Sequence, residues 1–361
     1  MFPSRCEPRT NIDWPPSLLD QGGMSRPRKV VSVAPAGLNF IFDPIVTGLR
    51  ARGYEVTHFT DFVEFDRVSD AVLKDAEAFV VLSNFPCGKV LMKKAPHLLG
   101  IVSPFIGTEG IDEVAATELG IMVANGQVPE NVLSMSESTI MLILVSCYSL
   151  HWWQQQLREN QPHPAQVPGR MLRGRMLGMI GCGQIARGIV ARLAGWEIQM
   201  QTYVPRLRTP LPPGVKRVGL QELLQTSDVV CVLAPLNAET RGMLDFERLR
   251  LMKPDAVLIN TARGGIVDEA ALVQIARERP NLKIAIDTFA QEPLAPDSRL
   301  RALPNAILTP HAIGHTQESI NALPAAAIEN VSRILQGELP PYLRNPDVIP
   351  QWRRRLAREG E

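Results

Sequence analysis

The sequence has 361 residues, of which 45% are hydrophobic and 21% charged, and its formal net charge is +1. Two ordinary domains fit into this length, with cores that need no disulfide or structural metal. Because the charges nearly balance, no basic excess favours nucleic acid, and we expect small molecules or copies of the same chain as partners.

The chain opens with an extension and then alternates strands with helices. Residues 1–28 are rich in proline and charge without an apolar leader segment, so we expect a disordered extension, and Met1 and Met24 are both candidates for the true start. Alternation of short β-rich runs with a helical pattern predicts βαβ units and mostly parallel sheets. A helix is predicted at Ile41–Arg52, and strands are predicted at Val30–Val33, Glu55–Phe59, Ala78–Leu82, Trp196–Tyr203, Val229–Leu233, Ala256–Asn260 and Lys283–Asp287.

The longest apolar run, Ile140–Cys147, falls well short of the ~20 residues of a membrane span. It predicts a buried helix that also contributes to a homodimer contact. The five cysteines are scattered without a CxxC pair, which predicts a reducing, cytoplasmic environment and no metal site. Because the longest apolar run is too short to cross a membrane, we expect no membrane partner.

A strand, a glycine turn and a helix follow a surface connection at Asn160–Gly174. The turn reads G-C-G-Q-I-A, with Gly181, Gly183 and Ala186 at the positions of a dinucleotide-binding fingerprint, and Gln184 and Ile185 open the helix. Its first glycine permits a tight turn, and its second lets backbone approach a pyrophosphate at the positive end of the helix. This context favours a nucleotide site over an ordinary strand-to-helix turn.

The end of the next strand bears on which nucleotide binds. Val204 stands where NAD-selective proteins have an acidic residue for the ribose hydroxyls, and Arg206 and Arg208 follow. The arginines favour NADP, since a guanidinium pairs well with a 2′-phosphate. The alternative is that they belong to a solvated loop and that NAD still binds.

Several ordered motifs resemble the D-isomer-specific 2-hydroxyacid dehydrogenase family, which includes phosphoglycerate, glyoxylate/hydroxypyruvate and D-lactate dehydrogenases. They lie at Ile106–Asn125, Met179–Ala186, Leu233–Leu244, Ile259–Leu272, Ala285–Leu294 and Leu308–Thr316. The resemblance covers nearly all of the chain from Lys29 to about Pro346. It implies an α/β fold of two Rossmann-like or flavodoxin-like domains with parallel sheets and a cleft between them.

The same resemblance, with the element pattern, sets the expected domain boundaries. We expect a substrate domain at 29–130 and 308–346, because the chain after Asn305 should cross back to the first domain. The cofactor-binding domain is expected at 131–307, and residues 347–361 are expected to form a C-terminal tail.

The resemblance also implies an active site. Arg263 in T-A-R-G-G matches the substrate-binding arginine, Glu292 in Q-E-P the carboxylate partner, and His311 in T-P-H the acid/base histidine. A guanidinium fork suits a 2-oxo acid, and imidazole has a pKa near working pH. Each residue alone could be structural, whereas the three at neighbouring strand ends favour catalysis. His315 is given no catalytic role.

Other positions receive roles from the family. Ile106 and Gly107 match backbone amides that receive the substrate carboxylate. Cofactor contacts are implied at Pro235, Thr240, Thr261, Ala262, Asp287 and Gly314. Three residues depart from the family's pattern, namely Ser103, Phe105 and Leu233; the first two leave the substrate's identity open.

The sequence therefore leaves two hypotheses of function. The first is an NAD(P)-dependent enzyme that transfers a hydride between the nicotinamide and a 2-oxo or D-2-hydroxy acid. The second is a dehydrogenase-like nucleotide sensor of the corepressor kind, which retains the same triad. By resemblance, Glu292 argues against a formate dehydrogenase, where a glutamine takes this place, but not against a phosphite dehydrogenase.

Overall fold

The computed structural model describes residues 27–163, 169–207 and 209–359, and these divide into two compact units. Unit 1 contains the described residues up to Val128 and those from Ile320 onward, and unit 2 is Pro129–Ser319. The expected extension, residues 1–28, lies almost wholly outside the described residues. The chain returns to unit 1 at Ile320, whereas the sequence predicted this return at residue 308.

Unit 1 is built on a parallel five-stranded sheet with the order β2-β1-β3-β4-β5. All four residues of the central strand β3 are buried, as expected for a parallel sheet covered on both faces. Its strands are β1 (Lys29–Val33), β2 (Glu55–Phe59), β3 (Ala78–Val81), β4 (Gly100–Val102) and β5 (Met122–Ala124).

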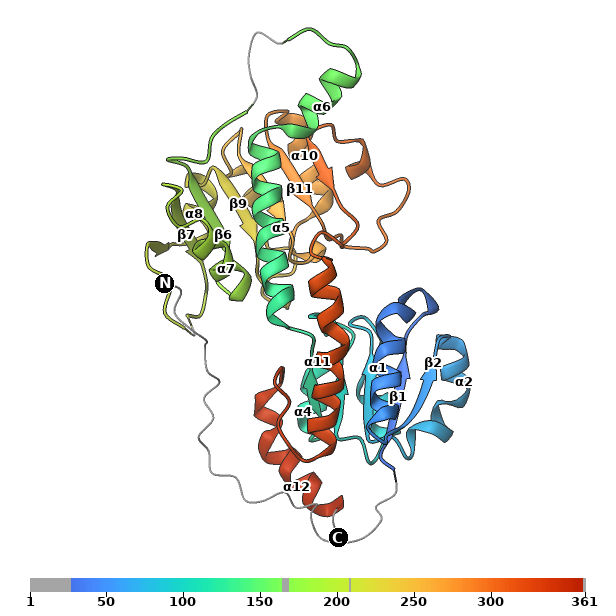
Figure 1. Cartoon of the computed structure of the whole chain (residues 1–361). Helices are drawn as coiled ribbons and strands as arrows, with labels where there is room; N and C mark the ends of the chain where they lie inside the picture. Colours follow the sequence, from blue (N-terminus) through green and yellow to red (C-terminus); the bar gives the residue numbers. More distant parts are fainter. Residues whose placement is uncertain (1–26, 164–168, 208, 360–361) are drawn as a thin grey trace. The chain divides into compact units, whose positions relative to one another are not determined.

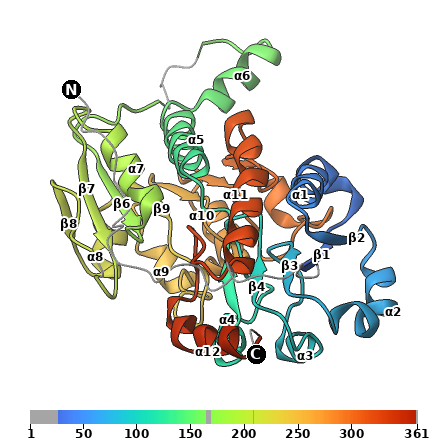
Figure 2. The same cartoon turned by 60° about the horizontal axis from the view of Figure 1, so that its bottom comes forward.

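Helices cover both faces of this sheet, with α1 and α11 on one side and α3 and α4 on the other (Figure 2). Close approach to α11 explains two glycines, because a Cβ at Gly48 or Gly100 would overlap Ile328 or Ile334. The helices are α1 (Asn39–Ala51), α2 (Phe62–Leu73), α3 (Lys89–Lys93), α4 (Glu113–Glu118), α11 (Gln317–Leu335) and α12 (Ile349–Glu359).

The expected C-terminal tail is mostly α12, so that expectation needs correction. Trp352 of this helix is 2% exposed and donates its indole N–H to the carbonyl of Leu99 at 3.1 Å. An aromatic anchor of this kind buries a large area and stabilises the docked helix. Residues 349–359 therefore belong to the fold of unit 1.

Unit 2 contains a parallel seven-stranded sheet in the order β12-β11-β10-β9-β6-β7-β8. The strand order reverses between β6 and β9, where open α/β sheets bind ligands at the carboxyl ends of their strands. The strands are β6 (Met176–Ile180), β7 (Gln199–Tyr203), β8 (Val215–Arg217), β9 (Val229–Val232), β10 (Val257–Asn260), β11 (Lys283–Ile286) and β12 (Ala306–Leu308).

Two apolar cores lie on opposite faces of this sheet. On one face, α5 and α7 supply residues such as Ile143 and Ile189, and Figure 1 shows α5 running along the strands. The other face receives α8, α9 and α10, with residues such as Leu272. The helices are α5 (Pro129–Cys147), α6 (Leu150–Arg158), α7 (Gln184–Arg192), α8 (Leu220–Thr226), α9 (Phe246–Arg250) and α10 (Glu269–Glu278).

The apolar run Ile140–Cys147 is the second half of α5, and Leu142, Ile143 and Cys147 are buried in the core of unit 2. The prediction of a buried helix is thus confirmed. Among the described residues, no single helix is long and apolar enough to cross a membrane. Helices α5 and α6 meet the length and composition test only as a pair, bent by 54°.

Candidate active site

The glycine turn joins β6 to α7 and has the geometry that a dinucleotide phosphate requires. Gly181 has a φ of +103°, and a Cβ there would lie 2.9 Å from the carbonyl oxygen of Leu233. Gly183 caps α7 without a side-chain hydrogen bond, and a Cβ on it would meet nothing within 4 Å. No side chain caps the start of α7 and the space beside Gly183 is open, which fits an anion at a helix N-terminus.

The loop after β7 carries the residues expected to choose between cofactors. Val204 offers no carboxylate, and its carbonyl accepts from Arg217 Nε at 3.1 Å. Arg206 is exposed and pairs with Glu239 Oε1 at 2.9 Å. Arg208 lies outside the described residues. The loop thus presents a guanidinium at the carboxyl edge of the sheet, with an acidic partner that the sequence motifs did not reveal.

Arg263 stands in extended conformation three residues after the end of β10, at the start of the turn Gly264–Ile266. The side chain of Asn260 clamps this turn, because its amide donates to the carbonyl of Arg263 and its oxygen accepts from the N–H of Ala262. The Arg263 guanidinium donates to the carbonyl of Ala262 at 2.7 Å. Asn260 is 1% exposed, so the clamp is protected from water.

Close backbone packing brings the Arg263 turn against the loop that carries Glu292. A Cβ on Gly264 would lie 1.9 Å from the carbonyl carbon of Phe289 and 2.3 Å from the N atom of Ala290. The Ala290 N–H in turn donates to Glu269 Oε1 at 2.6 Å. Only glycine permits this approach, which fixes one loop on the other.

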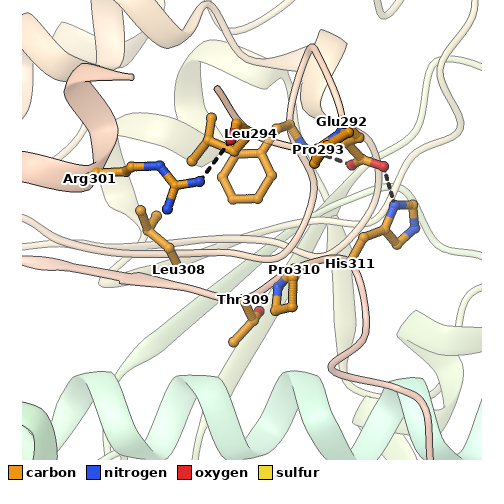
Figure 3. Close-up of a pocket in the computed structure, with 9 residues that line it drawn as sticks. Glu292, Pro293, Leu294, Arg301, Leu308, Thr309, Pro310 and His311 are labelled. Carbon is orange, nitrogen blue, oxygen red and sulfur yellow. Dashed lines mark hydrogen bonds and ion pairs between the residues drawn. The ribbon is translucent and has the colours of Figure 1, made fainter. Parts of the chain in front are cut away.

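Glu292 and His311 form a direct pair. His311 Nδ1 lies 2.6 Å from Glu292 Oε2, while Glu292 Oε1 accepts from the Phe289 N–H at 2.9 Å. One carboxylate oxygen is therefore held by backbone and the other orients the ring. Figure 3 shows this contact with Nε2 on the far side of the imidazole.

His311 has a φ of +54°, a left-handed conformation that costs energy in a residue with a side chain. Buried Asp287, 1% exposed, holds this turn together. Its Oδ1 accepts from Thr309 Oγ1 at 2.7 Å and from the N–H groups of Ala312 and Ile313 at 3.1 and 3.2 Å. The Asp287 carbonyl also accepts from the His311 N–H at 2.8 Å. Asp287 thus positions the histidine.

A cavity of about 520 Å³ adjoins the Glu292–His311 pair within unit 2. Its walls are mainly apolar, and Figure 3 shows Arg301 at the end away from His311. Arg301 donates to the carbonyls of Leu294 and Ala295 at 2.7 and 3.0 Å and so stiffens the loop over the cavity. The lining residues are Phe289, Glu292, Pro293, Leu294, Arg301, Leu308, Thr309, Pro310 and His311.

The remaining expected cofactor positions lie at the carboxyl edge of the same sheet. Thr261 is buried, and its hydroxyl contacts that of Thr139 on α5 at 3.1 Å. Because Thr139 gives its own proton to the Met135 carbonyl at 2.7 Å, Thr261 is the donor in this contact. Thr240 Oγ1 donates to the Pro235 carbonyl at 2.7 Å, which closes the turn after β9.

Gly314 belongs to the same edge and packs tightly against α5. A Cβ on it would lie 2.1 Å from Met135 Sδ. Its carbonyl accepts from Ser134 Oγ and Ser319 Oγ at 2.8 and 2.9 Å.

Burial lowers the pKa of neighbouring His315, as does the nearby His311. His315 therefore favours its neutral form.

Ile106 and Gly107 lie in unit 1, in the loop after β4. The carbonyl of Phe105 accepts from the Gly126 N–H at 2.9 Å, and that of Ile106 from Asn125 Nδ2 at 2.7 Å. In a planar trans peptide the N–H points opposite to the carbonyl. The N–H of Ile106 therefore points away from Gly126 and that of Gly107 away from the Asn125 amide, and neither donates to an acceptor among the described residues.

Comparisons with known proteins agree with this architecture. Residues 140–312 match the family described as "D-isomer specific 2-hydroxyacid dehydrogenase, NAD binding domain". The chain is 33% identical over 290 residues to a glyoxylate reductase from Aeropyrum pernix, which covers 76% of this chain and 85% of the relative. The chain belongs to the D-isomer-specific 2-hydroxyacid dehydrogenase family.

Two solved structures of dehydrogenases and reductases share the fold of this chain. The NADPH-dependent glyoxylate/hydroxypyruvate reductase from Sinorhizobium meliloti, in complex with NADP and malonate, matches with a TM-score of 0.74 and 25% identity, over 90% of this chain and 98% of the other. An NAD-dependent formate dehydrogenase from Staphylococcus aureus, in complex with NAD, gives 0.73 and 26%, over 86% and 96%.

This 2-hydroxyacid dehydrogenase is thus an NAD(P)-dependent oxidoreductase, and the family, the α/β fold of two units with parallel sheets and the enzyme class predicted from the motifs are confirmed. Nothing in the described residues or in these relatives favours the corepressor reading. Within the described part of the chain, no group of three or more His, Cys, Asp or Glu residues could hold a metal ion.

Motif reasoning missed several residues that hold the site together. Asn260, Gly264 and Glu269 support the Arg263 and Glu292 loops, and Asn125 supports the loop at Ile106. The G-G of T-A-R-G-G was a visible signal for Gly264. The others are ordinary polar residues in the sequence, and their contacts come from segments far along the chain.

Proposed function

We propose that this dehydrogenase reduces a 2-oxo acid reversibly to the 2-hydroxy acid, with Arg263, Glu292 and His311 as its working side chains. The His311 Nδ1–Glu292 Oε2 contact of 2.6 Å carries this proposal. With Nδ1 engaged by a carboxylate, Nε2 is the nitrogen that gives a proton to the forming alkoxide and removes it in reverse. The Glu292 charge supports the imidazolium and fixes the ring.

When bound, the nicotinamide supplies the hydride. The Arg263 guanidinium holds the carboxylate and carbonyl oxygens of the substrate and polarises the carbonyl, which a planar donor fork does well. The outward N–H groups of Ile106 and Gly107 provide further donors for the carboxylate. Supporting this role, the carbonyls of the same two peptides, those of Phe105 and Ile106, accept from Gly126 and Asn125, so that both donors are preset.

We propose that the cofactor binds along the carboxyl edge of the seven-stranded sheet. The turn from Gly181 to Ile185 receives the pyrophosphate, and Val204 with Arg206 favours NADP weakly over NAD. The adenosine side and the nicotinamide side are assigned to Pro235, Thr240, Thr261, Ala262, Asp287 and Gly314.

For the substrate we propose a small 2-oxo acid. The relatives named above are a glyoxylate reductase and a glyoxylate/hydroxypyruvate reductase, so these two acids are the first to test. The loops at 83–89 and 103–107 are expected to set selectivity. Phe105 and Ser103, which depart from the family's pattern, lie in the second loop; Ser103 is fully buried and its hydroxyl is unpaired among the described residues.

The deciding experiment follows reduced-nicotinamide absorbance with a panel of 2-oxo acids and either cofactor, for the wild type, His311→Ala and His315→Ala. We expect turnover by the wild type and a loss of at least ~10² in kcat for His311→Ala, because the general acid is removed. His315→Ala is the matched control and should stay within a few-fold. Cofactor binding without turnover in the wild type would support a sensor instead.

A homodimer in the cytoplasm is also proposed. The supporting observation is a set of exposed apolar side chains along α5, α6 and the link between them, since patches of this kind mark protein contacts. They are Met141, Tyr148, Leu150 and Leu157. Sedimentation equilibrium should give twice the chain mass, and replacing Leu157 by Glu should shift the chain toward the monomer.

A further inference from the structure

An ion pair spans the proposed nucleotide site in unit 2. Arg206 follows β7, and Glu239 lies in the turn after β9, with Arg206 Nη2 and Glu239 Oε1 2.9 Å apart. Strands β7 and β9 are the two neighbours of β6, whose end carries the glycine turn. The pair therefore connects the strand ends on either side of the turn expected to hold the pyrophosphate.

Both ends of this pair are mounted on fixed backbone. Asn237 Oδ1 accepts from the N–H groups of Glu239 and Thr240 at 2.9 and 3.0 Å, which sets the first turn. Arg217 fixes the other loop by donating to the carbonyls of Val204 and Pro205 at 3.1 and 2.9 Å. Only the two side chains need to move when a ligand arrives.

We propose that Glu239 is a specificity-determining residue that occupies Arg206 and thereby lowers affinity for NADP relative to NAD. This inference rests on the proposed cofactor site. A 2′-phosphate carries about −1.5 to −2 charges at neutral pH, so it needs Arg206 and is repelled by Glu239. NAD brings only a hydroxyl to this place and leaves the ion pair intact.

The same pair explains how both cofactors remain acceptable. The side chains of Arg206 and Glu239 are 75% and 59% exposed. An ion pair with so much exposure to water holds its partners only weakly. A phosphate can therefore take Arg206 from Glu239. Without Glu239, Arg206 would be available to the phosphate from the start, and the weak preference for NADP would become a strong one.

The test measures dissociation constants of NADH and NADPH by fluorescence titration of the full chain. Glu239→Gln should tighten NADPH binding about tenfold, which is the effect of removing a carboxylate at about 5 Å from a phosphate bound to Arg206 in a water-like dielectric. NADH affinity should change by less than about twofold. Arg206→Gln should weaken NADPH about tenfold and leave NADH unaltered.

Glu247→Gln removes an exposed carboxylate from α9 of the same unit and serves as the matched control. An equal gain in NADPH affinity in this control would overturn the inference, because the effect would then be one of net charge. Unchanged NADPH binding in Glu239→Gln, or loss of both cofactors, would overturn it as well. Failure of the wild type to bind either cofactor would instead refute the proposed function. Circular dichroism confirms that each variant is folded.

Discussion

The packing of Gly264 on the Phe289–Ala290 peptide predicts that Gly264→Ala separates the two catalytic loops. The added Cβ would lie 1.9 Å from the Phe289 carbonyl carbon, against backbone that has no flexible side chain to turn away. Carbon atoms attract at about 3.5 Å, so the loops must part by roughly 1.6 Å. Arg263 precedes this glycine, and Glu292 follows the displaced peptide by two residues.

Misplacement of catalytic groups by ~1 Å costs about 10²-fold in rate. We therefore expect kcat/KM of Gly264→Ala to fall at least ~10²-fold, and its unfolding free energy to fall by about 1–3 kcal/mol through overpacking. Cofactor affinity should fall less than kcat/KM, because the glycine turn at Gly181 is elsewhere on the sheet edge and only Thr261 and Ala262 lie on the displaced loop. Steady-state kinetics, fluorescence titration and urea unfolding measure the three quantities.

The adjacent residue provides the control. A Cβ on Gly265 would meet only the side chains of Leu236, at 3.2 Å, and Arg241, at 3.5 Å, which can give way. Gly265→Ala should keep kcat/KM within a few-fold. If Gly264→Ala retains wild-type kcat/KM, or if both variants lose activity equally, the argument from backbone contact is refuted.

Three further outcomes follow from individual contacts. Asp287→Ala should lose at least ~2 kcal/mol of unfolding free energy, because two N–H groups and a hydroxyl lose their acceptor. Asp287→Asn keeps an oxygen at this place and should recover most of that free energy. Equal losses in the two variants would indicate that the negative charge is needed. Asn125→Ala should raise KM for the 2-oxo acid about tenfold with kcat nearly unchanged, because the N–H of Gly107 loses its preset direction; an unchanged KM would exclude that role. Burial lowers the pKa of His58 below its usual value of 6.5, so the unfolded chain binds the extra proton first and the stability of the fold decreases as pH drops below 6.5. His58→Gln should make the melting temperature depend less on pH in this range. An unaltered pH dependence would show that other groups cause it.

Long, strongly patterned strands were predictable from the sequence. Glu55–Phe59 was predicted with the bounds that the structure has, and each of the other predicted strands differs from the observed one at a single end, by one to three residues. Four three-residue strands, β4, β5, β8 and β12, were missed, because so few residues carry no period that distinguishes them from loops. Helix α12 was missed for another reason, since its arginine-rich sequence reads as a polar tail until Trp352 is placed in a core.

The class of chemistry can be predicted from local sequence motifs. Local motifs indicate which groups are available, namely glycines after an apolar strand and, in ordered motifs, an arginine, a glutamate and a histidine. These residue types can be predicted because hydride and proton transfer require them. The tertiary structure alone decided how those groups are held: Gly264 against a peptide 25 positions away, Asp287 around His311, and Glu239 on Arg206. Contacts of this kind depend on which strand ends become neighbours, and that is a property of the sheet order, which no local stretch of sequence encodes.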